Sequence, residues 1–161
     1  MSRFAVSRTS TADIDAGMDE VFDILEQPAR VAELTPFLHS IIDRGDGTWL
    51  WSMTGIATPT GRLSPAFTER MTLQRPSLIR FEHAPPPGSN EIAGADGEYH
   101  LTPRADGQRG CTLHIALTVM LFLPLPALSR PLVRTTMNKV IDQMGAGFSR
   151  NILAELAGGG P

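Results

Sequence analysis

A change of hydrophobic period along the chain constrains the fold more than any other feature. Between Leu38 and Leu121, short alternating segments follow one another with only turn residues between them, the pattern of antiparallel strands. From Ser129 onward, apolar residues recur every three or four positions over about six turns, as in one long amphipathic helix. A sheet accompanied by one long helix must bury its apolar face against that helix. The helical stripe consists of Val133, Met137, Val140, Met144, Phe148, Ile152 and Leu156.

The segment before Leu38 predicts one strand and two short helices. Residues 3–14 are rich in Val, Ser, Thr and Ala and carry apolar residues at period two, which predicts a strand. Helical spacing begins at Met18 and continues to Leu25, with acidic residues in the first turn. Pro28 then starts a second short helix, and Pro36 ends it.

Turn signals divide the central segment into six further strands. Asp46-Gly47 and Asp106-Gly107 each separate two alternating runs and predict hairpins, while Pro59-Thr60-Gly61 and Arg75-Pro76-Ser77 mark other turns. Together with the first strand, these segments predict one antiparallel sheet of seven strands. The six strands are expected near residues 38–44, 48–56, 63–73, 78–84, 91–102 and 111–121.

Composition limits the domain count and the classes of function. The chain has 161 residues, of which 42% are hydrophobic, so we expect one domain over residues 1–157 and a flexible glycine-rich tail at 158–161. A formal net charge of −3 disfavours nucleic-acid binding, because a phosphate backbone attracts a positive surface. Cys111 is the single cysteine, and the four histidines lack the spacing of metal ligands. No nucleotide or hydrolase motif is present, so we expect no metal and no cofactor.

The sequence predicts a cytoplasmic protein with no transmembrane segment. The first residues lack the apolar stretch of a signal peptide. Residues 111–129 contain no Asp, Glu, Lys or Arg, but their first half alternates, and Pro124 and Pro126 would disrupt a spanning helix.

Several local motifs resemble those of the START-like superfamily, also called SRPBCC or helix-grip proteins, which includes the polyketide cyclase/dehydrase type. The motifs are IDAGMDEVFDIL at residues 14–25, LTPF at 34–37, GEYHLTP at 97–103 and LPLP at 123–126. The resemblance covers essentially the whole chain. It implies an α+β helix-grip fold, in which a seven-stranded curved antiparallel sheet surrounds a long C-terminal helix and two short helices lie between strands 1 and 2. It also implies a deep apolar cavity that binds lipids, polyketides or other hydrophobic small molecules.

One carboxylate interrupts an apolar strand face. Glu69 lies at period two between Phe67 and Met71. A carboxylate facing an apolar cavity must pair, accept hydrogen bonds or take a raised pKa, and it then serves as a general acid or base or anchors a ligand hydroxyl. The alternative is that Glu69 lies near the sheet edge and reaches water or Arg80.

Two other polar side chains are candidates for the same cavity. Ile79 and Phe81 place His83 on the inner face at period two, and Leu101 does the same for Tyr99. A few polar groups in an apolar pocket are typical of a small-molecule site. Glu69, His83 and Tyr99 are therefore candidate catalytic residues, with no role assigned to any of them.

The cavity wall is expected on the apolar faces of sheet and helix, where lining residues and packed core look alike in sequence. Gly145, Ala146 and Gly147 thin the long helix, which indicates either a bend or close packing against a strand, or a bend that shapes a cavity. The uncharged segment Met120–Leu128 either packs under the sheet end or gates the cavity, contacts a membrane or forms a homodimer contact. The expected ligand-binding residues are Trp49, Trp51, Met53, Phe67, Met71, Phe81, Tyr99, Leu113, Ile115, Leu117, Met137, Val140, Ile141, Met144 and Phe148.

Two functions follow from this reading of the sequence. The first is binding or transport of a hydrophobic small molecule between the sheet and the C-terminal helix, without chemistry. The alternative is a cyclase or dehydratase type of enzyme in which a few polar cavity residues transfer protons.

Overall fold

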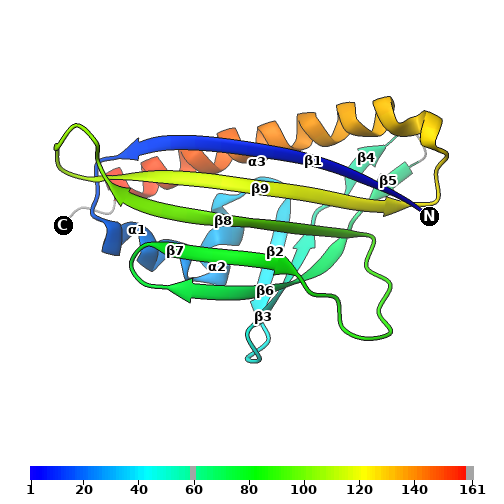
Figure 1. Cartoon of the computed structure of the whole chain (residues 1–161), viewed down its shortest axis with the longest axis horizontal. Helices are drawn as coiled ribbons and strands as arrows, with labels where there is room; N and C mark the ends of the chain where they lie inside the picture. The colour runs from blue at the N-terminus through cyan, green and yellow to red at the C-terminus, as the bar shows by residue number, and fades with distance from the viewer. Residues whose placement is uncertain (59–60, 159–161) are drawn as a thin grey trace.

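A seven-stranded antiparallel sheet surrounds one long helix in the computed structural model, which describes residues 1–58 and 61–158 (Figure 1). The predicted α+β helix-grip fold is confirmed, with two short helices between the first two strands. The elements are β1 (Ser2–Ile14), α1 (Met18–Leu25), α2 (Pro28–Leu34), β2 (Leu38–Asp43), β3 (Thr48–Met53), β4 (Ile56–Thr58), β5 (Gly61–Leu63), β6 (Ala66–Gln74), β7 (Leu78–His83), β8 (Ala93–Pro103), β9 (Cys111–Leu123), a 3₁₀ turn η1 (Ala127–Ser129) and α3 (Arg130–Gly158).

The sheet order is β1-β9-β8-β7-β6-β3-β2, so the chain runs through the sheet as a meander that β1 completes by pairing with β9. The predicted hairpins at Asp46-Gly47 and Asp106-Gly107 are present. Gly47 and Gly107 have φ values of +87° and +72°, which other residues rarely adopt.

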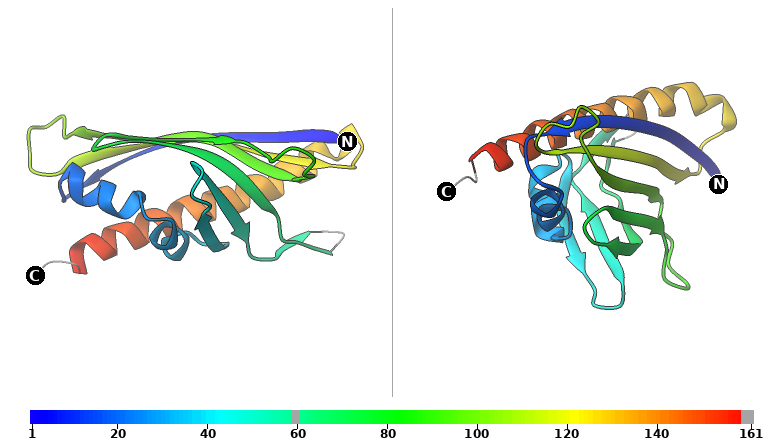
Figure 2. Two further views of the ribbon diagram at one scale, coloured as in Figure 1. Left: turned by 90° about the horizontal axis from the view of Figure 1, so that it is seen from below. Right: turned by 60° about the vertical axis from the view of Figure 1, so that its left-hand side comes forward.

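All three helices lie on the concave side of the sheet (Figure 2). Helices α1 and α2 cover one end of this face, and α3 runs along its length. Apolar side chains of α1 and of the last turns of α3 form one core cluster, represented by Phe22 and Ile152, which are each 1% exposed. A second cluster lies under α2, and a third joins Phe4 of β1 to Met137 of α3. The central part of the sheet therefore faces α3, and packed apolar clusters lie at both ends of this central part.

The two strands expected at 48–56 and 63–73 are each divided. A bend at Thr54-Gly55 separates β3 from β4, and a bend at Ser64-Pro65 separates β5 from β6. Proline has no N–H to continue a ladder, although the carbonyl of Pro65 still accepts a hydrogen bond from Met53 N at 2.9 Å. The β4–β5 pair consequently forms a separate small hairpin that lies toward the first turns of α3 (Figure 1).

Parts of one predicted turn and of the predicted C-terminal tail fall outside the described residues. Pro59 and Thr60 of the predicted turn are among these, as are residues 159–161 of the predicted tail, whereas Gly158 is the last residue of α3. None of the helices in the described ranges is both long and apolar enough to cross a membrane.

The two glycines in the middle of α3 have different surroundings, and the close packing is against Pro36, between α2 and β2, rather than against a strand. A Cβ on Gly147 would lie 2.3 Å from Pro36 Cγ, so this glycine permits close packing of α3 against the segment after α2. A Cβ on Gly145 would have no atom within 4 Å, and Gly145 lines a cavity. Close packing and cavity formation therefore occur on different sides of the same turn of the helix.

Because the two glycines differ in this way, we expect substitution by alanine to have opposite effects on stability at the two positions. We expect Gly147→Ala to lower the free energy of unfolding by about 1–3 kcal/mol, because the methyl group overlaps Pro36 in a packed contact. Gly145→Ala is the matched control and should be neutral or stabilising by up to about 1 kcal/mol, because alanine favours the helix and has room. Urea unfolding of both variants measures the difference, and equal effects would show that the α3–Pro36 contact is not tight.

Candidate functional site

A cavity of about 850 Å³ lies between the central part of the sheet and α3. Its wall is mainly apolar, with alternate residues of β9 on one side and the inward face of α3 on the other. The β9 side includes Ile115, Leu117 and Val119, and the α3 side includes Val140 and Met144. This volume is within the range of roughly 300–1,000 Å³ found for small-molecule sites.

The structure brings most of the predicted lining residues together on the wall of this cavity. Trp49, Met71 and Leu113 differ from the prediction, because they pack in the core instead. Helices α1 and α2 cover the end of the sheet where Leu113 and Trp49 lie, so their side chains contact helix rather than cavity. The predicted residues found on the wall are Trp51, Met53, Phe67, Phe81, Tyr99, Ile115, Leu117, Met137, Val140, Ile141, Met144 and Phe148.

One end of the cavity is bounded by residues that were not predicted. The β4–β5 hairpin contributes Ile56, Arg62 and Leu63 to the wall. Arg62 of β5 and Leu132 of α3 are both exposed, so the cavity reaches the surface between the hairpin and the first turns of α3. Gly55 and Pro65 were the sequence signals that would have indicated a separate hairpin here, whereas its place beside the cavity depends on the tertiary structure.

The segment Met120–Leu128 divides between wall and surface. Met120 is buried, and Leu121, Leu123 and Leu125 line the cavity, as expected if the segment packs under the sheet end. Leu128 lies in η1, just before α3, and unlike these residues it is 93% exposed.

Glu69 is fully buried and belongs to the cavity wall. Its Oε1 accepts a hydrogen bond from the backbone N–H of Ala95 at 2.8 Å. In the part of the chain that the structure describes, its Oε2 is buried and has no hydrogen-bond partner. Burial is the main reason that the pKa of Glu69 rises from the ordinary 4.5 to about 9; the Ala95 hydrogen bond opposes this rise, and the negative charges of Asp96 and Glu91 add to it. Glu69 is therefore protonated at neutral pH.

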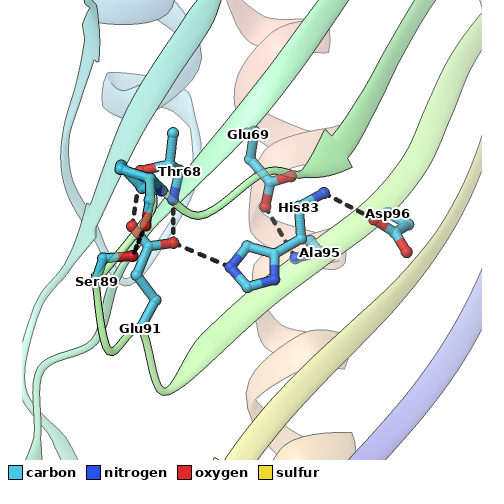
Figure 3. Close-up of polar contacts among 8 residues, drawn as sticks. Thr68, Glu69, His83, Ser89, Glu91, Ala95 and Asp96 are labelled. Carbon is cyan, nitrogen blue, oxygen red and sulfur yellow. Dashed lines mark hydrogen bonds and ion pairs between the residues drawn. The ribbon is translucent and has the colours of Figure 1, made fainter.

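Glu69 is one of three carboxylates at the place where β7 separates from β8. The ladder between these strands extends to the pair Phe81–Gly97 and then stops. Beyond it, carboxylate oxygens take the hydrogen bonds of backbone N–H groups that the sheet no longer satisfies (Figure 3). The three bonds run from Ala95 N to Glu69 Oε1, from His83 N to Asp96 Oδ1 and from Thr68 N to Glu91 Oε1.

His83 does not line this cavity, contrary to the prediction. It is the last residue of β7, where the strand diverges from β8, so period two no longer fixes its side. Its Nε2 lies 3.0 Å from Oε1 of Glu91, and its ring occupies the space of a Cβ on Gly94. Burial alone would raise the pKa of Glu91, but hydrogen bonds from Thr68, together with His83, hold the pKa of this carboxyl below its usual range.

Tyr99 lines the cavity as predicted from its strand face. Its ring centroid lies 5.6 Å from that of Phe81 and 6.1 Å from that of Phe148, so it joins the sheet to α3. Burial raises the pKa of Tyr99 to about 12, and the phenol is neutral at physiological pH. It is half-buried because part of its surface faces the cavity.

Trp51, a residue of the same wall, has a second buried polar atom without a partner among the described residues. Its indole ring stacks on Phe67 of β6 with centroids 6.2 Å apart and is tilted against Phe81 of β7 at 6.3 Å. Nε1 is buried and has no hydrogen-bond partner among the described residues. Indole N–H groups are usually hydrogen-bonded when buried, so this donor is unusual.

Among the described residues, no three His, Cys, Asp or Glu side chains lie close enough together to hold a metal ion. Cys111 is fully buried at the start of β9, and burial raises the pKa of its thiol. Glu69, Tyr99 and Trp51 are thus the polar groups of interest on the apolar wall.

The comparisons with known proteins agree with this architecture. The sequence matches the family model described as polyketide cyclase/dehydrase and lipid transport over residues 5–153. No curated protein sequence matches the chain.

Solved structures share the fold at low sequence identity. Zhui, an aromatase/cyclase from Streptomyces sp. R1128, is 14% identical, with 96% of this chain and 93% of that chain covered and a TM-score of 0.64. The di-domain aromatase/cyclase StfQ from the steffimycin biosynthetic pathway is 16% identical, with 98% of this chain and 53% of that chain covered and a TM-score of 0.64. A START superfamily protein from Mycobacterium smegmatis is 14% identical, with 91% and 96% covered and a TM-score of 0.59. At these identities the similarity shows the fold alone.

Proposed function

Because the chain belongs to the polyketide cyclase/dehydrase and lipid transport family, we propose that it binds a hydrophobic small molecule in the cavity between its sheet and α3. The observation that carries this proposal is the cavity of about 850 Å³ with a mainly apolar wall. Burial of apolar surface supplies the affinity, at about 25 cal/mol per Å² removed from water. The few polar groups on the wall then orient the ligand.

Titration with the neutral apolar fluorophore N-phenyl-1-naphthylamine tests this proposal. We expect saturable binding to one site with an increase in fluorescence, because the dye leaves water for an apolar wall. A second neutral ligand such as a fatty alcohol should displace the dye competitively. Unsaturable or absent binding of both compounds would contradict the proposal.

Proton-transfer chemistry of the cyclase or dehydratase type is the second candidate function. Glu69 favours it, because a carboxyl that is protonated at neutral pH in an apolar cavity is able to donate a proton to a bound substrate. Tyr99, also neutral and on the wall, is a second candidate proton donor there.

The open end of the cavity has the character of a membrane-contacting surface. Leu128 and Leu132 are 93% and 58% exposed beside the cavity mouth. In the sequence, Arg130 lies between the two leucines and Arg134 follows Leu132, and both arginines are also exposed. Residues 107–141 contain no Asp or Glu, although the whole chain has a net charge of −3. Apolar side chains with nearby cations suit an anionic lipid surface, from which a hydrophobic ligand is able to enter the cavity.

We therefore expect Leu128→Ser together with Leu132→Ser to weaken association with vesicles containing phosphatidylglycerol by at least about tenfold, because two inserted leucines are lost. Co-sedimentation with the vesicles measures this association. Leu153→Ser is the matched control, since Leu153 is an exposed leucine near the other end of α3. Unchanged binding by the double variant would contradict membrane contact, as would a wild-type protein that forms dimers through the same leucines.

A further inference from the structure

The first strand and the last helix run side by side, and apolar side chains close the contact between them, the β1–α3 seam, at both of its ends (Figures 1 and 2). At one end, Phe4 and Val6 of β1 pack in one cluster with Met137 of α3. At the other end, Ile14 of β1 packs in one cluster with Ile152 of α3.

The middle of the seam lacks such packing on the side of the strand. Side chains of β1 alternate between the two faces of the sheet, so the residues on the side of Phe4 and Ile14 include Arg8, Ser10 and Ala12. None of these last three residues is buried, and Ser10 is exposed. The strand therefore offers polar and small side chains to α3 over the central part of the seam.

The cavity reaches the surface at this place. Ser10 of β1 and Gly145 and Ala146 of α3 line the cavity, and all three are exposed. A Cβ on Gly145 would have no atom within 4 Å, so the helix leaves open space here. The mouth beside Arg62 and Leu132 lies near the first turns of α3, and the packed cluster at that end of the seam separates the mouth from this place. The cavity therefore has a second opening, in the middle of the β1–α3 seam.

One arginine bridges the seam at this opening. Arg8 lines the cavity, and its Nε lies 3.0 Å from Oδ1 of Asp142 in an ion pair. Its Nη2 donates a hydrogen bond to Oδ1 of Asn138 at 2.5 Å, and its Nη1 donates one to the carbonyl oxygen of Ser7 at 3.0 Å. The side chains of Arg8 and Asp142 are 38% and 63% exposed, and ion pairs between exposed side chains are weak. Arg8 therefore joins the strand to the helix by contacts that break readily.

We propose that the second opening is an exchange route for the ligand, and that Arg8 closes it as a strap between β1 and α3. When the ion pair with Asp142 breaks, the arginine side chain turns to solvent and the ligand passes between Ser10 and Gly145. The route rests on the proposed binding function and concerns the rates of ligand entry and release rather than the identity of the ligand. A strap that only opens and closes changes both rates by the same factor, so the dissociation constant stays the same.

Release of N-phenyl-1-naphthylamine into an excess of a nonfluorescent fatty alcohol, followed by stopped-flow fluorescence, tests this route. We expect Arg8→Ala to speed release by about three- to fivefold, the effect of losing one exposed ion pair, and to leave the dissociation constant within about twofold of wild type. Raising the salt concentration from about 20 mM to about 500 mM should speed release from the wild type, because salt screens the ion pair, and should not affect Arg8→Ala. Since the dye is uncharged, this salt effect reports on the protein.

Arg30→Ala is the matched control. Arg30 of α2 forms an ion pair with Glu155 and so also joins α3 to another element, but neither residue lines the cavity. This variant should release the dye at the wild-type rate, and an acceleration equal to that of Arg8→Ala would refute the route, because the rate would then reflect the general mobility of α3. If wild type and Arg8→Ala release the dye equally fast at both salt concentrations, the route is refuted and the binding function stands. If the wild type does not bind the dye, the binding function itself fails, and the route with it.

Discussion

Substituting tryptophan for both Leu117 and Val140 is expected to weaken binding of N-phenyl-1-naphthylamine by roughly a hundredfold, about 2.7 kcal/mol, while the fold is retained. The two residues lie on opposite walls of the cavity, one on β9 and one on α3. Two indole rings would therefore meet in the space that the ligand needs. Fluorescence titration measures the affinity, and circular dichroism measures the retained fold.

The chain offers a matched control at the two adjacent positions. Ala116 and Lys139 are next to Leu117 and Val140 in sequence but do not line the cavity. Tryptophan at Ala116 and Lys139 adds the same aromatic mass to the outer faces of the same elements, so dye affinity should stay close to wild type. Equal losses of affinity in both double variants would show that the cavity is not the binding site.

The stability of the protein is expected to fall with rising pH because of Glu69. The folded protein holds this proton to a pKa of about 9, whereas the unfolded chain releases it near the ordinary 4.5. The contribution of Glu69 is complete below pH 4.5 and is lost as the pH rises to about 9, at up to about 1.4 kcal/mol per pH unit. Several kcal/mol is a large part of the roughly 5–15 kcal/mol that stabilises a domain.

Glu69→Gln isolates this effect, because glutamine has nearly the same shape and does not ionise. Urea unfolding at several values between pH 5 and 9 should show that the variant gains stability relative to wild type with each step upward. Glu82→Gln, a change at an exposed position of β7, serves as the control and should run parallel to wild type. A Glu69→Gln curve that is also parallel to wild type would mean that Glu69 is ionised in the folded protein.

Sequence periodicity predicts the main elements well because burial of one face repeats regularly along them. The alternation on β9 and the stripe on α3 correspond to one continuous wall, with Ile115 and Leu117 facing Val140 and Met144 across the cavity. The Asp-Gly turns locate hairpins because their backbone needs positive φ values. These local rules are enough to predict the order of strands and the covering helix.

Periodicity fails where the sheet stops being regular. His83 was expected on the inner face, but β7 leaves β8 after Phe81, and Glu91 from the following loop binds the imidazole. Trp49 and Trp51 share a strand face, look alike in sequence and pack in the same cluster with α2, yet of the two only Trp51 is also on the cavity wall. Which residues are core and which are cavity depends on how far the helices reach, and this is a tertiary property.

The two unpaired atoms of Trp51 and Glu69 were beyond sequence reasoning for a related reason. Glu69 stood out as a charged residue on an apolar face, but its hydrogen bond to Ala95 depends on the separation of β7 from β8. Trp51 was expected on the cavity wall, but nothing in the sequence indicates that its N–H lacks a partner, since the indole N–H of a buried tryptophan is ordinarily hydrogen-bonded. Its unpaired N–H becomes visible only when its neighbours Phe67 and Phe81 are in place.

Native mass spectrometry of the protein purified without detergent from its own organism tests the central claim most directly. The account predicts a bound apolar small molecule that is released on unfolding and extracts into organic solvent. The double variant with tryptophan at Leu117 and Val140 should be isolated without it. A wild-type protein that carries no such molecule, and that fails to take up apolar compounds offered to it, would contradict the claim that this fold encloses a ligand-binding cavity.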